Sequence, residues 1–156
     1  MWNSLPGKML MTVLISMVPV VELRGAIPIA VAHGLDYHAA IPLAILGNLI
    51  PVPFILIFIR RIFHWMHLRS EKLSALVDRM EARVDRKRAV VEQYEFLGLI
   101  ILVAIPLPGT GAWTGALVAA LMRLRFRRAL PAIVIGVLIA GMIVSFVTYG
   151  AASIVS

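Results

Sequence analysis

Four apolar stretches, separated by shorter polar segments, dominate the hydrophobic pattern of the chain: 9–32, 39–59, 96–121 and 129–152. A helix needs roughly 20 predominantly apolar residues to cross the hydrocarbon core of a bilayer. The second and fourth stretches meet this requirement, although the prolines in the second will bend it. We therefore expect two transmembrane helices from these stretches.

The first and third stretches are interrupted near their middle. The first is broken between Pro19 and Pro28, and the third by the run Pro-Leu-Pro-Gly-Thr-Gly at 106–111. Proline removes a helix donor and clashes with the preceding turn, while glycine permits tight turns. Each stretch thus predicts two helices of about 10–13 residues, too short to span the membrane separately. A helical hairpin that enters and leaves by the same face fits both stretches.

The composition and the positions of the charges support this arrangement. A chain of 156 residues that is 61% hydrophobic, with a mean hydropathy of +0.95, has the composition of one membrane domain. Of its 15 lysines and arginines, nine lie at 60–88 and four at 123–128. Two re-entrant hairpins would place both basic segments on one side, as the positive-inside rule requires, whereas four full spans would separate them. We expect a multi-pass protein of the cell membrane in which 60–95 and 122–128 are cytoplasmic. We expect no nucleic-acid partner.

The two halves of the chain are related. Sliding the sequence by 89 residues aligns 19–47 with 108–136, and six of these 29 pairs are identical: Pro19/Pro108, Ala30/Ala119, Leu35/Leu124, Ala40/Ala129, Pro42/Pro131 and Gly47/Gly136. One hairpin and one span per half make the copies cross in opposite directions, as in many transporters. We therefore predict an all-α integral membrane protein with an inverted-topology repeat. Its single membrane domain, 1–156, comprises repeat 1 at about 9–59, a cytoplasmic amphipathic helix at about 62–95 and repeat 2 at about 96–152.

Two charges, Glu22 and Arg24, lie inside the first apolar stretch. Ionised side chains within membrane segments are costly and by default indicate a functional site. A carboxylate shielded from water can take up and release a proton, which suits proton coupling. A guanidinium can bind a carboxylate or phosphate through two hydrogen bonds. The alternative is an internal ion pair that only fixes the hairpin tip.

The second break, 106–115, contains glycines that let backbone N–H groups turn inward where a helix begins. Gly25 begins the matching half-helix in the first repeat, so two positive helix ends and Arg24 would favour a negatively charged ligand. The candidate substrate-binding residues are Glu22, Arg24, Gly25, Gly109, Thr110, Gly111 and Trp113. Close helix packing through the Gly111 and Gly115 pair is an alternative use of the same glycines.

The remaining polar residues predict no chemistry. The histidines at 33, 38, 64 and 67 are expected at the membrane interface, since a metal site needs three or four converging ligands. The chain has no cysteine, which excludes disulfides and thiolate metal sites. No nucleophile triad or nucleotide-binding loop is recognisable, so we expect no catalytic residue, no metal, no cofactor and no enzymatic activity.

The motifs ELRGAIP at 22–28 and PLPGTGAW at 106–113 resemble those of the small multidrug export protein family, over nearly the whole chain. The family name implies export. A more distant similarity is to the DedA (VTT-domain) membrane proteins, whose early E-x-x-G-x-P pattern looks like Glu22 to Pro28 with one extra residue before the proline. That resemblance implies two re-entrant hairpins and the flipping of lipid phosphates. The arginines that flank the late Pro-Gly pair of DedA proteins are replaced here by Ala104 and Gly111.

Three functions follow as expectations. The first is a DedA-like carrier or flippase for a lipid-linked or small anionic substrate, proton-coupled through Glu22, with membrane lipids as partners and a homodimer as its assembly. The second is a small exporter of lipophilic cations, for which a membrane Glu is the counter-ion. The third is a non-transporting membrane scaffold whose cytoplasmic helix recruits a partner.

Overall fold

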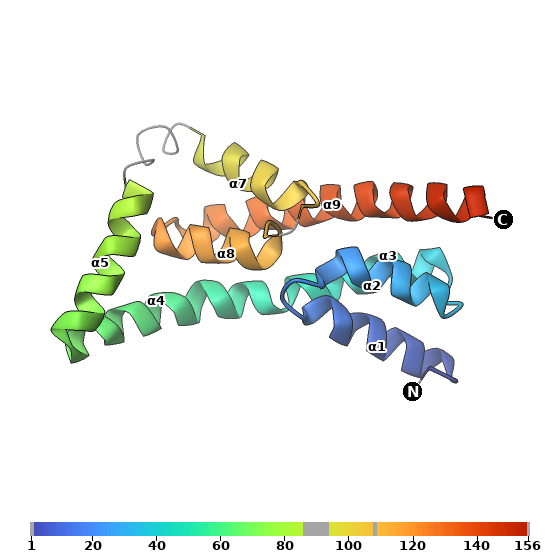
Figure 1. Cartoon of the computed structure of the whole chain (residues 1–156), viewed down its shortest axis with the longest axis horizontal. Helices are drawn as coiled ribbons and strands as arrows, with labels where there is room; N and C mark the ends of the chain where they lie inside the picture. Colours follow the sequence, from blue (N-terminus) through green and yellow to red (C-terminus); the bar gives the residue numbers. More distant parts are fainter. Residues whose placement is uncertain (1, 86–93, 108, 156) are drawn as a thin grey trace.

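The computed structural model describes residues 2–85, 94–107 and 109–155, and these residues form helices and connecting turns without a strand (Figure 1). The all-α prediction is therefore confirmed for the described part of the chain. The helices are α1 (Leu5–Met17), α2 (Glu22–Ala32), α3 (Tyr37–Leu49), α4 (Pro51–Arg69), α5 (Glu71–Asp85), α7 (Glu95–Ala104), α8 (Ala112–Leu121) and α9 (Phe126–Val155).

Two helical segments are long and apolar enough to cross a membrane: Tyr37–Arg69, with 33 residues, and Phe126–Val155, with 30 residues. The first joins α3 and α4 end to end, and it runs in the opposite direction to α9 (Figure 1). At 1.5 Å per residue this segment is about 50 Å long, more than the roughly 30 Å hydrocarbon core of a bilayer. Its composition changes accordingly, from apolar residues to a basic end that begins at Arg60.

The short helices form two hairpins, α1–α2 and α7–α8. Each hairpin begins and ends at the same end of the molecule, and the two come from opposite ends, so that their tips lie near each other in the middle (Figure 1). The hairpin α1–α2 packs on α3, and α7 packs on α9. The second arm of each hairpin, α2 or α8, also contacts the long segment of the other half: α2 contacts α9, and α8 packs on α4. The core between them consists largely of alanines, whose small side chains allow close helix approach, and of valines and isoleucines.

The two hairpins have residues with positive φ at equivalent positions. In the described part of the chain the residues with positive φ fall into pairs that are 89 positions apart: Val20 with Gly109, Glu22 with Gly111, and Gly34 with Arg123. The φ angles of these residues are 80° and 82°, 48° and 115°, and 77° and 53°. Non-glycine residues seldom adopt positive φ, so this correspondence adds a structural observation to the sequence similarity of the two halves.

The second arms end in the same way. At the end of α2 the N–H of Leu35 donates to the carbonyl of Ala30 (3.0 Å), and at the end of α8 that of Leu124 donates to Ala119 (3.0 Å). With a left-handed residue just before each leucine, these are Schellman motifs, in which the leucine also packs on the final turn of the helix. Two of the six identities in the repeat therefore have a structural cause.

Each long segment has a glycine on which the first arm of its own hairpin packs. The contacts are Gly47 with Val13 and Ser16, and Gly136 with Ile100 and Val103. The contacting residues of the first helix in each hairpin are 87 positions apart along the chain, whereas Gly47 and Gly136 are 89 positions apart. The tip of the second hairpin is therefore two residues longer than that of the first. The contacts are close: a Cβ added at Gly47 would lie 2.5 Å from the Val13 carbonyl oxygen.

These contacts predict that Gly47→Ala lowers the thermal unfolding midpoint, because the added methyl group would push α1 away from α3. A loss of about 1–3 kcal/mol is expected for such overpacking. Gly98→Ala is the matched control, since a Cβ there meets nothing within 4 Å. It should stabilise slightly, by about 0.5–1 kcal/mol, because alanine loses less backbone entropy in a helix. Equal changes in unfolding midpoint for the two variants, measured in detergent micelles, would contradict this packing.

Candidate functional site

The carboxylate of Glu22 lies at the N-terminus of α8, on the opposite hairpin. Its side chain is buried, with 3% exposure, and Oε1 accepts a hydrogen bond from the backbone N–H of Trp113 (3.2 Å). The first N–H groups of a helix have no partner within it and carry a partial positive charge. The anion-binding helix end predicted from the glycine-rich run thus receives a carboxylate from the protein itself.

Trp113 makes a second link between the hairpins. Its ring Nε1 donates to the carbonyl of Met17 (3.2 Å), at the last residue of α1. The backbone of Trp113 therefore holds Glu22, and its side chain holds the end of the neighbouring arm. Both bonds draw α8 against the tip of the first hairpin.

Arg24 lies two residues after Glu22 in α2 and binds the tip of the second hairpin. Its guanidinium donates to the carbonyls of Leu107 and Ile105, the latter at 3.2 Å, and to Thr110 Oγ1 at 2.9 Å. Ile105 and Leu107 flank Pro106 in the tip that is longer by two residues. Nε of Arg24 is buried and has no hydrogen-bond partner among the described residues. One donor of this guanidinium is therefore without an acceptor in the described part of the chain.

Thr110 stabilises the turn that Arg24 binds. Its hydroxyl lies 2.6 Å from the Ile105 carbonyl and 2.8 Å from that of Leu107, and it can donate its one proton to either. It also accepts from the N–H of Leu107 (3.3 Å). The short polar side chain thus replaces helix hydrogen bonds where the chain turns.

The three candidate glycines differ in their surroundings. Gly111, with φ of 115°, lies against both charges: an added Cβ would be 2.8 Å from Cδ of Glu22 and 2.9 Å from Nη2 of Arg24. A Cβ at Gly109 would meet nothing within 4 Å, and one at Gly25 would lie 2.5 Å from Val21 Cγ1. Of these glycines, Gly111 is the one whose small size lets the two hairpins meet at the charged residues.

Glu22 and Arg24 bind the opposite hairpin rather than each other. The ion pairs among the described side chains are His67–Asp78 and Arg123–Glu81, and neither involves these residues. The two charges make no direct ion pair, and the electrostatic attraction between them acts in addition to their bonds to the second hairpin. The two charges instead connect the first hairpin to the second at two separate points.

A groove opens beside Arg24, between α2, the second tip and the C-terminal half of α9. Its volume is about 560 Å³, and its walls are mostly apolar. Pro28 and Pro106 form one side, and Ile143, Val147 and Thr148 are among the α9 residues that form the other. Arg24 is the ionisable residue of this lining, whereas Glu22 is not part of it. The groove therefore combines one positive group with an apolar wall.

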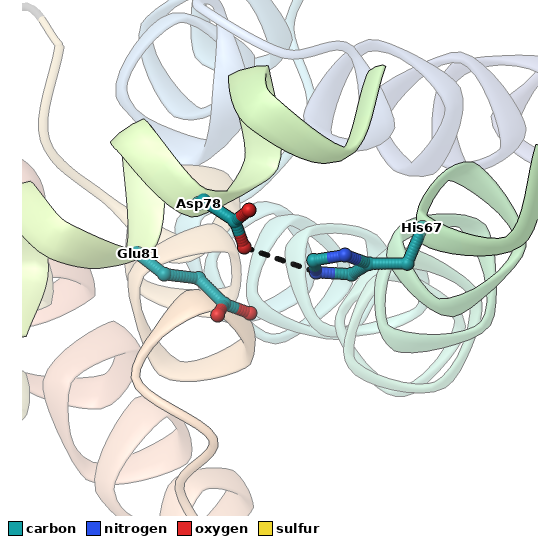
Figure 2. Close-up of side chains that lie close together, drawn as sticks. All are labelled: His67, Asp78 and Glu81. Atoms are coloured by element: carbon teal, nitrogen blue, oxygen red, sulfur yellow. Dashed lines mark ion pairs between the residues drawn. The ribbon is translucent and has the colours of Figure 1, made fainter. Parts of the chain in front are cut away.

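A second polar cluster, which the sequence analysis did not predict, joins α4 and α5. His67 Nε2 lies 3.7 Å from Asp78 Oδ1, and Glu81 lies beside them (Figure 2). The potential ligand atoms are within 4.8 Å of one another, so these residue types could hold a divalent cation. Both oxygens of Glu81, however, accept from Arg123 Nη2 at 3.1 Å. His67 lies on a different helix from the two acids, which is why sequence spacing gave no signal.

The described helices define an all-α protein with two segments long enough to cross a membrane. Residues 22–143 match the family model described as "Putative small multi-drug export protein", and the chain belongs to this family. The resemblance seen in the two motifs is thereby confirmed. The family is named for export and not for an enzymatic reaction. Neither the curated proteins nor the solved structures contain a significant match to the chain.

The position of Gly111 generates a test with Gly109 as the control. Gly111→Ala and Gly109→Ala both place a side chain at positive φ, but Gly111, with φ of 115° and ψ of −167°, lies in a region open essentially only to glycine. The Gly111 variant should be less stable by an additional amount of about 1–3 kcal/mol, because of this backbone strain and because its methyl group displaces Glu22 and Arg24. Denaturant unfolding of both variants in micelles measures the difference. Equal stability would mean that the charged side chains are not packed against Gly111.

Proposed function

We propose that the protein is a membrane carrier for an amphiphilic anion, either a lipid-linked substrate or a small anionic compound. The observation that supports this most is the lining of the groove beside Arg24. Its apolar wall suits a hydrocarbon chain, and a guanidinium binds phosphate or carboxylate through paired hydrogen bonds. The unpartnered Nε of Arg24 adds a donor for such a group.

In this proposal the two hairpins are re-entrant, and the two halves form an inverted-topology repeat in a single membrane domain. The opposite directions of the hairpins and the shared backbone angles support it (Figure 1). The basic residues from Arg60 onward and those near Arg123 then lie on the cytoplasmic side, in agreement with the positive-inside rule. The hairpin tips lie at mid-membrane, where many transporters bind their substrates.

The hydrogen bonds between the tips suggest how binding is coupled to movement. An anion at Arg24 competes with the carbonyls of the second tip for the same guanidinium donors. Protonation of Glu22 removes the negative charge from the N-terminus of α8 and weakens the second link. Loss of both links frees the tips to separate, so that the groove changes the side to which it opens. Glu22 thereby provides proton coupling.

Export of lipophilic cations is the second candidate, because the name of the family describes multidrug export. Glu22 would then be the counter-ion for the drug. Its carboxylate, however, is 3% exposed, accepts a hydrogen bond from Trp113 and lies outside the lining of the groove. A cation in the groove would meet Arg24 first, which favours the anionic substrate.

The membrane arrangement predicts the labelling of single cysteines. Cysteines at Ser70 and Arg125 should react with a membrane-impermeant maleimide from the cytoplasmic side, and a cysteine at the exposed residue Asp36 from the opposite side. Labelling of Ser70→Cys and Arg125→Cys from opposite faces would mean four full spans. That result would exclude the re-entrant hairpins.

The sign of the substrate can be determined with two variants at the tips. Arg24→Ala should weaken binding of a lipid phosphate by about 2–5 kcal/mol, the usual cost of removing one partner of a buried charged pair. Arg24→Lys keeps the charge and serves as the control for the paired hydrogen bonds of the guanidinium. Glu22→Gln imitates the protonated acid, so binding should persist while pH-driven transport stops.

An exporter of cations predicts the reverse, with binding lost in Glu22→Gln and kept in Arg24→Ala. Equilibrium binding of a lipid phosphate and a lipophilic cation to each variant separates the two functions. Each variant must first give a monodisperse, folded protein, since an unpaired charge in the membrane can itself destabilise the hairpin. Undiminished anion binding by a folded Arg24→Ala variant would refute the proposed function.

A further inference from the structure

A second pocket lies at the end of the molecule where the basic segments meet, away from the groove at Arg24. Its volume is about 320 Å³, and it lies between α4, α5 and the turn from α8 to α9. Two arginines line it, Arg60 and Arg123, together with His64, His67 and a single acid, Glu81. The permanent charges of this lining therefore sum to one positive charge, which favours an anionic occupant.

Arg60 provides the most specific observation. Its Nε and Nη2 atoms are buried and have no hydrogen-bond partner among the residues that the structure describes. These two nitrogens form one edge of the guanidinium, where the two N–H bonds are parallel and match two oxygens of a phosphate or carboxylate. Buried donors of a charged group are costly without acceptors, so this edge lacks two oxygen atoms that a ligand can supply.

Arg123 is held in place from the other side of the pocket. It has a φ of 53°, whereas its equivalent in the first hairpin is Gly34, the residue type that adopts this conformation without strain. Both oxygens of Glu81 bind its Nη2 atom (3.1 Å), which fixes the guanidinium beside α5. The backbone angle of Arg123 belongs to the Schellman motif that ends α8, and the bonds to Glu81 place its exposed guanidinium at the pocket.

We propose that this pocket binds a phosphate group, and that the group belongs to the headgroup of an anionic phospholipid. Arg60 is the first charged residue of α4 after an apolar run of nine residues, at the level where lipid phosphates lie beside a transmembrane helix. The side-on edge of Arg60 holds two phosphate oxygens, and Arg123 adds its charge across the pocket. The bound lipid fastens α5 and the α8–α9 turn to α4. The proposal depends on neither Glu22 nor Arg24.

The test is thermal unfolding of the purified full-length protein in micelles during titration with dihexanoyl phosphatidylglycerol. Dihexanoylglycerol, which has the same chains without the phosphate, is the lipid control, and inorganic phosphate is the soluble one. The unfolding midpoint of the wild type should rise with phosphatidylglycerol and not with dihexanoylglycerol. A rise of the same size with inorganic phosphate would mean that the phosphate comes from solution, and would overturn the assignment to a lipid.

Arg60→Gln should weaken the apparent affinity for phosphatidylglycerol about tenfold or more, since hydrogen bonds to charged groups are strong. Arg61→Gln is the matched control: it removes the same charge from the next residue, which is exposed. Arg60→Lys keeps the charge without the paired N–H groups, so it should also bind phosphatidylglycerol weakly. It replaces Arg60→Gln in the test if that variant does not fold.

Glu81→Gln distinguishes an anion site from a cation site built on the neighbouring acids (Figure 2). The substitution removes the one negative charge of the lining and releases Arg123, so phosphatidylglycerol should bind more tightly. A phospholipid bridged by a divalent cation would bind less tightly to this variant, which would overturn the proposal. Equal affinities of Arg60→Gln and Arg61→Gln would also overturn it.

Discussion

The contact between the Glu22 carboxylate and the first turn of α8 satisfies two requirements at once. A carboxylate that is 3% exposed needs hydrogen-bond donors, and a helix that begins inside the protein needs acceptors for its free N–H groups. Gly111 makes the approach possible because it has no Cβ. The arrangement of the hairpins depends on this contact, since it holds α8 against the first tip, while Arg24 holds the second tip against α2.

The contact of Glu22 with α8 joins equivalent positions of the two halves of the chain, and its chemistry comes from the residues that differ between them. By the offset of 89 residues, Glu22 corresponds to Gly111 and Arg24 to Trp113, so the residues that meet are equivalent positions of the two hairpins. The first hairpin supplies side-chain charges, and the second supplies backbone groups. The two additional residues of the second tip contribute the Leu107 carbonyl that Arg24 binds. Where the two hairpins meet, one positive group lines an apolar groove.

Much of this fold could be predicted from the sequence, because prolines and glycines interrupt the apolar stretches at equivalent positions. The short paired helices and the two long segments follow from that pattern. The pattern could not show that Glu22 would occupy the helix end expected to bind a ligand, because this depends on how two distant tips pack. The pocket at Arg60 was missed for a similar reason: its residues lie on three separate segments, and no spacing along the chain connects them.

The most direct test of the central claim is a comparison of ligands that differ only in the sign of their charge. Binding of dodecyl phosphate and of dodecyltrimethylammonium to the wild-type protein in nanodiscs can be measured by isothermal titration, with protein-free nanodiscs as the reference for partition into lipid. Since Arg24 is the ionisable residue of the groove, we predict saturable binding of the phosphate and no competition by the ammonium compound. Saturable binding of dodecyltrimethylammonium, without binding of the phosphate, would contradict an anion carrier and identify a cation exporter.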